Sequence, residues 1–292
     1  MRYYTFFPGC CLWASAKGYG LSIEPVSSLF EMKLVELEDW NCCGATACVS
    51  AGHLEATCIA ARNLALAKKK GLDLVTPCSC CYGNFNRVNS QLKLYPELED
   101  KVNSCLGDVG LEYHGEIRVR HLWEVMFNDI TLEVIKSKVV KPLTGLKVAP
   151  YYGCQLIRPG IGFDDPEFPQ SLDQLITSLG AEATPFPLKS RCCGGSLIIS
   201  QMDLALSLIR QLFDSAQSGG AQCLVTTCPL CYLNLEAFQS TVNSKYKTKY
   251  NLPVLFFTQL IGLALGIDPK ALGLDTAIVS AEKMLASVGW RT

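Results

Sequence analysis

The chain has 292 residues, a net charge of −1 and hydrophobic residues at 49% of its positions. This length is enough to bury a substantial core, and the near-zero charge argues against binding to nucleic acid or to an anionic membrane surface. The 16 cysteines, many of them in metal-ligand spacing, indicate a reducing compartment rather than a disulfide scaffold.

Two apolar stretches are too short or too interrupted to place the chain in a membrane. Residues 3–7 are too few for the core of a signal peptide. Residues 252–267 contain Pro253, Thr258 and Gln259, so this stretch is interpreted as a strand followed by a helix and falls short of a membrane span. We therefore expect a cytoplasmic protein without direct membrane insertion.

Strand and helix patterns alternate along the first half of the chain. We expect strands at residues 3–7, 34–37, 72–76 and 117–121, and helices at residues 19–32, 53–70, from about 82 onward, and from 122 to about 138. The helix at 53–70 has one face made of Leu54, Cys58, Ala61 and Ala65. Residues 142–145 are interpreted as a linker.

The same order of strands and helices is expected again after the linker. We expect strands at residues 146–151, 183–186, 223–227 and 254–257, and helices at 171–179 and 203–216, the latter with Leu204, Leu208 and Leu212 on one face. Alternating strands and helices predict an α/β fold with parallel strands. We expect two similar domains, residues 1–143 and 144–292, each a small parallel sheet with flanking helices.

Five cysteines recur in the same order in both halves. The first set is Cys10, Cys42, Cys43, Cys78 and Cys81, and the second set is Cys154, Cys192, Cys193, Cys228 and Cys231. From residue 42 to 84 the halves align at a constant offset of 150, which also pairs Tyr82 with Tyr232 and Asn84 with Asn234. Every member lies just beyond the end of an expected strand, where open α/β sheets place their ligands. The repeat therefore predicts one site in each half.

Five thiols in a site favour an iron–sulfur centre of extended shape. A zinc ion and a cubane [4Fe–4S] cluster each take four ligands. Neighbouring residues of an extended segment point to opposite faces, so a Cys-Cys pair reaches two atoms of a larger object more easily than one small ion. The alternatives are four ligands with one spare small hydrophobic cysteine, and structural zinc.

Glycines follow both Cys-Cys pairs. Gly44, Gly194 and Gly195 are candidates for a close approach of the backbone to a cofactor, since glycine has no side chain to obstruct it. Ordinary turn glycines are the equally acceptable alternative.

The doubled pattern resembles the B subunit of heterodisulfide reductase, a family with two Cys-Cys-Gly (CCG) domains, and the resemblance covers nearly the whole chain. The segments nearest to that family are Phe7-Pro8-Gly9-Cys10, Trp40-Asn41-Cys42-Cys43-Gly44 and Tyr151-Tyr152-Gly153-Cys154. The resemblance implies a non-cubane [4Fe–4S] cluster on five cysteines in each half, two in all. It also implies that these cluster-bearing cysteines are catalytic and that the pair of clusters cleaves a disulfide.

The chain lacks sequence signals for collecting electrons by itself. No ferredoxin-like cysteine run lies outside the repeat, and no Gly-x-Gly-x-x-Gly follows a strand. We therefore expect a partner protein. By the resemblance, this partner is ferredoxin-like, of the type of the C subunit of heterodisulfide reductase, and it connects the chain to a flavin-containing subunit.

The resemblance implies that the chain is the catalytic iron–sulfur subunit of a heterodisulfide reductase-type complex. It would reduce or form a disulfide in one-electron steps, with a small disulfide or a sulfur carrier as substrate. The sequence does not choose the substrate or the direction. One alternative is an electron-transfer subunit like those of lactate or glycolate oxidation, and another is a zinc-stabilised interaction module.

The remaining cysteines are expected not to bind metal. They are Cys11, Cys48, Cys58, Cys80, Cys105 and Cys223, of which Cys11 and Cys80 lie nearest to the repeated pattern. By the offset of 150, Ile198, Leu208 and Leu230 stand opposite Cys48, Cys58 and Cys80. Exchange with such residues suits a cysteine that serves as a small core residue.

A first prediction concerns two of these cysteines. Replacing Cys58 or Cys223 by Ala should leave the iron content of the purified chain unchanged, because their counterparts in the repeat are not ligands. Unfolding measurements should show a stability loss of about 1–3 kcal/mol where the cysteine is buried. Loss of a whole cluster from either variant would show that the symmetry of the repeat is misleading.

Overall fold

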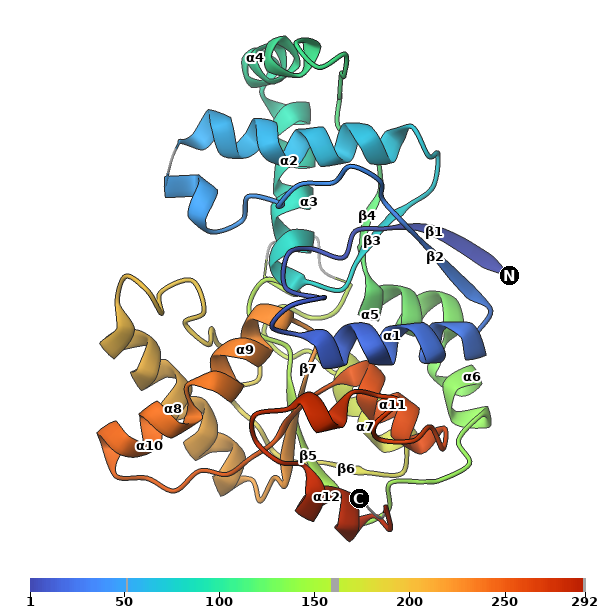
Figure 1. Cartoon of the computed structure of the whole chain (residues 1–292), viewed down its shortest axis with the longest axis vertical. Helices are drawn as coiled ribbons and strands as arrows, with labels where there is room; N and C mark the ends of the chain where they lie inside the picture. The colour runs from blue at the N-terminus through green and yellow to red at the C-terminus, as the bar shows by residue number, and fades with distance from the viewer. Residues whose placement is uncertain (51, 159–162, 291–292) are drawn as a thin grey trace. The chain divides into compact units, whose positions relative to one another are not determined.

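The computed structural model describes residues 1–50, 52–158 and 163–290. The chain forms two compact units: the first comprises Met1–Cys10 and Ser27–Val125, and the second comprises Cys11–Val26 and Met126–Thr292. Each unit is built around a parallel four-stranded sheet with flanking helices (Figure 1). The α/β fold class predicted from the sequence is thereby confirmed, whereas the expected boundary between residues 143 and 144 stays a prediction.

The sheet of the first unit has the strand order β2-β1-β3-β4. Its strands are β1 (Arg2–Phe6), β2 (Met32–Glu36), β3 (Leu74–Thr76) and β4 (Val119–His121). All neighbouring strands pair in parallel, with Thr5 opposite both Val35 and Leu74. Leu74 and Val75 are fully buried, as expected for a central strand that is covered on both faces.

Helices connect these strands along the chain. They are α1 (Lys17–Leu29), the 3-10 helix η1 (Ala47–Ser50), α2 (His53–Lys68), α3 (Ser79–Leu94), α4 (Pro96–Gly107) and α5 (Leu122–Val125). Helix α4 packs against α2 and α3. It begins with Pro96 at its first position, where a proline costs no hydrogen bond.

The second sheet repeats the topology of the first, with the order β6-β5-β7-β8. Its strands are β5 (Lys147–Tyr151), β6 (Glu182–Ala183), β7 (Cys223–Thr226) and β8 (Val254–Phe256). The strand pairs are again parallel, so β1, β2, β3 and β4 correspond to β5, β6, β7 and β8.

The helical elements after residue 125 surround this second sheet. They are the π-helix η2 (Met126–Ile130), α6 (Leu132–Ser137), α7 (Ser171–Ser178), α8 (Met202–Ser218), α9 (Pro229–Ala237), α10 (Gln239–Tyr246), α11 (Phe257–Ala264), η3 (Leu274–Thr276) and α12 (Glu282–Ser287). The stretch 252–267 is a strand followed by a helix, as predicted. None of the helices in residues 1–50, 52–158 and 163–290 has the length and apolar character needed to cross a bilayer.

The buried faces of two helices differ from those expected. In α2, Ala61 and Ala65 are buried, but Leu54 and Cys58 are only half-buried. In α8, Leu212 is buried, whereas Leu204 is 47% exposed. Both helices have apolar residues over more than half of their circumference, so an i, i+4 series can follow the edge of the buried stripe instead of its centre.

Residues 11–26, which lie between β1 and β2 in the sequence, pack within the second unit. The ring of Tyr19 stacks on Phe256 with a centroid distance of 4.0 Å, and its hydroxyl donates to the Thr227 carbonyl oxygen at 3.3 Å. The hydroxyl groups of Ser22 and Thr258 lie 2.6 Å apart. Residues 11–26 thus complete the core around β8 and α11, although more than 200 residues separate them in sequence from this core.

A second prediction tests this long-range packing. Replacing Tyr19 by Ala removes a fully buried aromatic ring together with its hydrogen bond, and should lower the free energy of unfolding by about 3–5 kcal/mol. The matched control is Tyr3→Ala, because Tyr3 is 53% exposed. Equal losses in the two variants, measured by denaturant unfolding, would contradict the assignment of residues 11–26 to this core.

Candidate functional site

The cysteines of the repeat follow the carboxyl ends of parallel strands. In the first unit Cys10 follows β1, the Cys42-Cys43 pair follows β2, and Cys78 follows β3. Cys154, the Cys192-Cys193 pair and Cys228 follow β5, β6 and β7 in the same way. Because the carboxyl ends of parallel strands share one edge of a sheet, each set is delivered to a single place in its unit.

The thiols of the first set are joined by side-chain hydrogen bonds. Cys43 shares hydrogen bonds with Cys42 and Cys81. Cys42 also interacts with Cys10, and Cys81 with Cys78, so all five side chains form one connected group.

The second set has the equivalent arrangement. The sulfur atoms of Cys193 and Cys231 lie 3.6 Å apart. Cys192 shares hydrogen bonds with Cys154 and Cys193, and Cys231 with Cys228. The structure therefore brings together the five cysteines that the repeat predicts in each half, while their role as ligands stays a prediction.

Each set contains a thiol that is easy to deprotonate. Hydrogen bonds from Cys42 and then Cys81 lower the pKa of Cys43 to about 5. A hydrogen bond from Cys154, followed by one from Cys193, holds the pKa of Cys192 far below its ordinary value. The donating Cys154 is correspondingly harder to ionise, since its hydrogen bond to Cys192 raises its pKa. The thiolate is the metal-binding form of cysteine, so both sets have the electrostatics of a cation site.

The Cys-Cys-Gly turns direct a backbone N–H at a sulfur. Gly44 has a φ of +81° and its N–H donates to the sulfur of Cys42 at 3.5 Å. Gly194 has a φ of +78° and donates to Cys192 at 3.3 Å. This left-handed conformation favours glycine, so both residues act as turn glycines that also present a donor. Gly195 differs: a Cβ there would lie 3.0 Å from Leu230 and 3.4 Å from the sulfur of Cys193.

A second pair of glycines, which the sequence analysis did not single out, leaves room for the last cysteine of each set. A Cβ at Gly9 would lie 3.3 Å from the sulfur of Cys81, and one at Gly153 would lie 3.2 Å from that of Cys231. Their position directly before Cys10 and Cys154 in both halves is the sequence signal for this role.

Two asparagines hold the Cys-Cys pairs in place, and the sequence analysis gave them no role. Asn84 on α3 donates from Nδ2 to the carbonyl oxygen of Cys43 at 2.6 Å. Asn234 on α9 donates to the carbonyl oxygen of Cys193, also at 2.6 Å. Both asparagines are buried, and they are related by the offset of 150 that aligns the cysteines. This shared offset was the feature of the sequence that could have identified the two asparagines as site residues.

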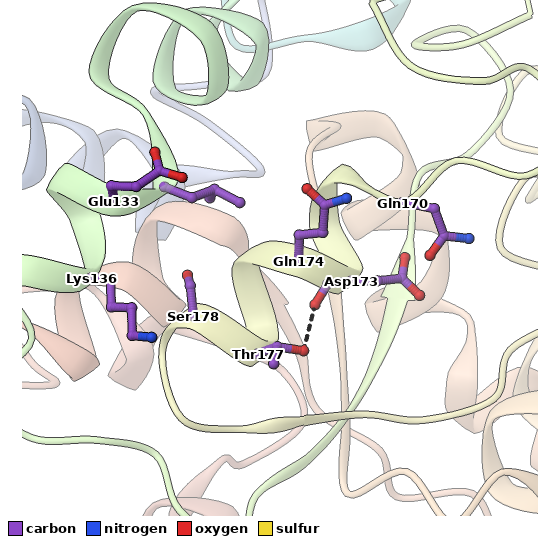
Figure 2. Close-up of a pocket in the computed structure, with 8 residues that line it drawn as sticks. Glu133, Lys136, Gln170, Asp173, Gln174, Thr177 and Ser178 are labelled. Carbon is purple, nitrogen blue, oxygen red and sulfur yellow. Dashed lines mark hydrogen bonds between the residues drawn. The ribbon is translucent and has the colours of Figure 1, made fainter.

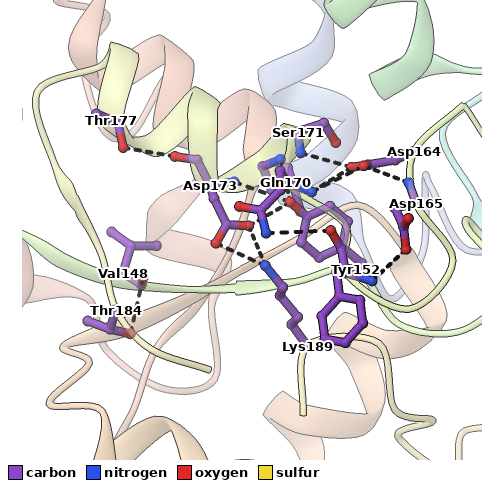
Figure 3. A network of polar contacts seen from close by, with 12 residues as sticks. Val148, Tyr152, Asp164, Asp165, Gln170, Ser171, Asp173, Thr177, Thr184 and Lys189 are labelled. Atoms are coloured by element: carbon purple, nitrogen blue, oxygen red, sulfur yellow. Dashed lines mark hydrogen bonds and ion pairs between the residues drawn. The ribbon is translucent and has the colours of Figure 1, made fainter. Parts of the chain in front are cut away.

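The Tyr151-Tyr152 pair makes hydrogen bonds to the segments next to the second cysteine set, and Figure 3 shows the contacts of Tyr152. The Tyr152 hydroxyl donates to Asp173 at 2.7 Å and accepts from the backbone N–H of Leu172 at 2.7 Å. The backbone N–H groups of Tyr152 and Gly153 donate to the carbonyl oxygen of Lys189 at 3.0 and 3.1 Å.

The same network fixes the segment that ends in Cys192. The Lys189 ammonium group donates to the Asp173 carboxylate at 3.1 Å, and the contact is drawn in Figure 3. The Tyr151 hydroxyl donates to the carbonyl oxygen of Arg191 at 2.8 Å. These contacts tie the strand that leads to Cys154 to the loop that leads to Cys192, which keeps these two cysteines side by side.

Of two cavities in the second unit, the smaller contains a predicted site residue and the larger does not. The smaller one has a volume of about 420 Å³ and is lined by Cys192, Arg158, Arg191, Leu188, Leu208, Gln211 and Leu212. The larger one, of about 510 Å³, lies between α6 and α7 and has a polar lining that includes Glu133, Lys136 and Asp173 (Figure 2). We assign the candidate site to the smaller cavity, because it reaches an exposed cysteine of the repeat.

The six remaining cysteines have varied surroundings. Cys223 on β7 is fully buried, and burial raises the pKa of its thiol to about 12. Cys58 is half-buried and Cys105 exposed, and their side chains share a hydrogen bond between α2 and α4. The interpretation as a small core residue thus suits Cys223 and not Cys58. Cys11, Cys48 and Cys80 are all half-buried.

The residues of each set fit an iron–sulfur group by the chemistry of their donors. Five thiols and a backbone N–H directed at a sulfur are the groups that bind and tune such a cofactor. In residues 1–50, 52–158 and 163–290, no three or more His, Cys, Asp or Glu side chains are arranged to hold a metal ion. The fit therefore rests on the donor set and its hydrogen bonds, not on a coordination geometry.

Known proteins are similar to this chain over almost its whole length. The family model described as a cysteine-rich domain (CCG) matches residues 4–86 and again residues 148–236. The 8-methylmenaquinol:fumarate reductase membrane anchor subunit of Wolinella succinogenes is 36% identical over 283 residues, which cover 96% of this chain and 98% of that protein. The B subunit of the ferredoxin/F420H2-dependent CoB-CoM heterodisulfide reductase of Methanosarcina acetivorans is 33% identical over 290 residues, covering 97% of this chain and 96% of that protein.

A solved structure shares the fold. A crystallised hypothetical protein from Helicobacter pylori superposes with a TM-score of 0.76 at 19% identity and covers 96% of this chain. The chain spans 52% of the length of that protein. At this identity the likeness concerns the fold alone.

A third prediction tests the hydrogen bonds of Tyr152 next to the second cysteine set. Tyr152→Phe removes the hydroxyl and leaves the N–H of Leu172 and a carboxylate oxygen of Asp173 without this partner. The free energy of unfolding should fall by about 1–3 kcal/mol. Thermal or denaturant unfolding measures the loss, and Tyr3→Phe on an exposed tyrosine is the control. A variant as stable as the control would show that this network does not hold the loop.

Proposed function

Because the chain belongs to the family of proteins with a doubled cysteine-rich (CCG) domain, we propose that it is the catalytic iron–sulfur subunit of a heterodisulfide reductase-type complex. More generally, the chain is a CCG-type electron-transfer or reductase subunit. The observation that carries the proposal is the pair of five-thiol sets, each at one sheet edge and each with the same hydrogen bonds from a glycine and an asparagine.

In this proposal each set binds one [4Fe–4S] cluster of non-cubane type. The ligands are Cys10, Cys42, Cys43, Cys78 and Cys81 in the first unit, and Cys154, Cys192, Cys193, Cys228 and Cys231 in the second. Such a group, when bound, supplies electrons one at a time. Gly44 and Gly194 donate N–H groups to a ligand sulfur, and Tyr151 and Tyr152 keep the loops of the second set in register.

The reaction is the cleavage or formation of a disulfide. Cleavage consumes two electrons and two protons and yields two thiols, and formation releases them. The cavity at Cys192 supports access of a small disulfide or sulfur carrier to the second set. Partner proteins of the ferredoxin-like and flavin-containing types provide the electrons, and we place the complex in the cytoplasm.

The alternative is an electron-relay subunit whose complex performs its chemistry elsewhere. The relative from the 8-methylmenaquinol:fumarate reductase of Wolinella succinogenes favours it, since 96% of this chain aligns with a component of that different enzyme. A relay role of the lactate or glycolate oxidation type belongs to the same class. Zinc-stabilised interaction without redox chemistry is the third possibility.

A fourth prediction separates these functions. Anaerobically purified chain should contain about eight iron atoms with a matching amount of acid-labile sulfide, and it should consume a small disulfide with an artificial one-electron donor. Cys43→Ser and Cys193→Ser should each abolish this turnover. Cluster content without turnover would favour the relay, and zinc without sulfide would favour the interaction module.

A further inference from the structure

A charged side chain is attached to the first cysteine set through a chain of hydrogen bonds. Arg87, one turn after Asn84 on α3, donates from its guanidinium group to Oδ1 of Asn84. The amide of Asn84 in turn donates from Nδ2 to the carbonyl oxygen of Cys43 at 2.6 Å. A cation on the acceptor end of an amide polarises it and strengthens the bond that its N–H groups donate.

The chain of bonds continues through the backbone to a sulfur. The carbonyl of Cys43 and the N–H of Gly44 belong to the same peptide group, which is conjugated. Polarisation of this carbonyl therefore makes the Gly44 N–H a stronger donor, and this N–H points at the sulfur of Cys42 at 3.5 Å. Arg87, Asn84 and the Cys43–Gly44 peptide together form a continuous relay from a positive charge to a cysteine of the set.

The second unit has the same relay without its charged end. Asn234 donates to the carbonyl oxygen of Cys193 at 2.6 Å, and the N–H of Gly194 donates to Cys192 at 3.3 Å. The offset of 150 places Ala237 where the first unit has Arg87. Oδ1 of Asn234 is buried and has no hydrogen-bond partner within the described residues. The repeat thus supplies an internal comparison in which one charged group is missing.

We propose that Arg87 is a positioning residue that acts through Asn84 and the Cys43–Gly44 peptide to raise the reduction potential of the iron–sulfur group on the first cysteine set. The inference rests on the proposed function, because it requires such a group. Reduction adds negative charge, and hydrogen bonds to the sulfur ligands stabilise the reduced state. The relay makes the two sets unequal even though their ligands match.

The second set also has a cation near it, Arg158, which acts on Cys192 through its charge and not through an asparagine. Arg158 lowers the pKa of Cys192 through its charge, but by less than the hydrogen bonds from Cys154 and Cys193 do. Its side chain is 40% exposed and lies 3.8 Å from Glu167, so water and an opposite charge weaken its field. The test therefore compares each set with itself, before and after a change at position 87 or 237.

The central experiment is a redox titration of the anaerobic full chain, followed by electron paramagnetic resonance. A Cys231→Ser background confines the signal to the first set, and Cys81→Ser confines it to the second. Arg87→Ala should lower the reduction equilibrium constant of the first set by up to about tenfold, which is about 59 mV for one electron. Arg87→Lys retains the charge and should restore part of the shift.

The reciprocal variant introduces an arginine at the equivalent position of the second unit. Ala237 is half-buried, as is Arg87, so an arginine there can reach Asn234 while its stem stays partly in solvent. Ala237→Arg should raise the potential of the second set and leave that of the first unchanged. Arg87→Ala and Ala237→Arg each introduce the residue that the other unit has at the equivalent position, so the fold should tolerate both changes.

The outcomes separate the inference from the function on which it rests. Iron and sulfide in wild-type amounts with an unchanged potential in Arg87→Ala would overturn the relay and leave the proposed function intact. Equal shifts of both sets would also overturn it, because the hydrogen bonds that start at Arg87 reach only the first set. Wild-type chain without iron would overturn the proposed function and the inference together.

Discussion

One hydrogen bond, present in both units, fixes the geometry on which each cysteine set depends. It runs from an asparagine amide to the carbonyl of the second cysteine in the Cys-Cys pair, from Asn84 to Cys43 and from Asn234 to Cys193. The helix that carries each asparagine begins directly after the next cysteine of the set. This bond therefore fixes the loop after the second strand relative to the helix after the third. Without it the loop that carries the Cys-Cys pair would lose its direct bond to the helix that carries the asparagine.

The backbone around this bond is suited to sulfur rather than to a bulky side chain. Gly44 and Gly194 adopt left-handed conformations that aim an N–H at the preceding Cys-Cys pair, and Gly9 and Gly153 leave space beside a sulfur of the same set. Hydrogen bonds among the thiols then favour one thiolate in each set. Backbone shape and thiol electrostatics thus favour the same use of the site, the binding of a cationic cofactor.

Much of the fold was predictable because the chain repeats itself. The alternation of strands and helices, confirmed by two parallel sheets of identical strand order, follows from local hydrophobic pattern. The gathering of the cysteines follows from the position of each after a strand. Their spacing in sequence could not reveal the asparagine bonds, since an asparagine in a helix has many possible partners. The alignment of Asn84 with Asn234 was visible in the sequence, but the hydrogen bonds of both to a cysteine carbonyl appear only in the folded structure.

Other features depend on contacts between distant residues, which local patterns do not report. Leu204 matched a helical apolar series yet is exposed, because the packed face of α8 is centred on neighbouring positions. The half-buried Cys58 lies against Cys105 of α4, a helix that the pattern did not identify. Residues 19–32 gave a weak helical pattern, and the partners of Tyr19 and Ser22 lie in the second half of the chain.

The placement of residues 11–26 has a consequence for how the protein is made. Tyr19 emerges from the ribosome 237 residues before its stacking partner Phe256. At synthesis rates of about 5–20 residues per second, the residues against which this segment packs are made at least about ten seconds after it. During that time the apolar side of α1 stays available to chaperones or to wrong partners. The first half therefore cannot complete its native contacts as an independent piece, and the order of synthesis is a physical constraint on the yield of folded protein.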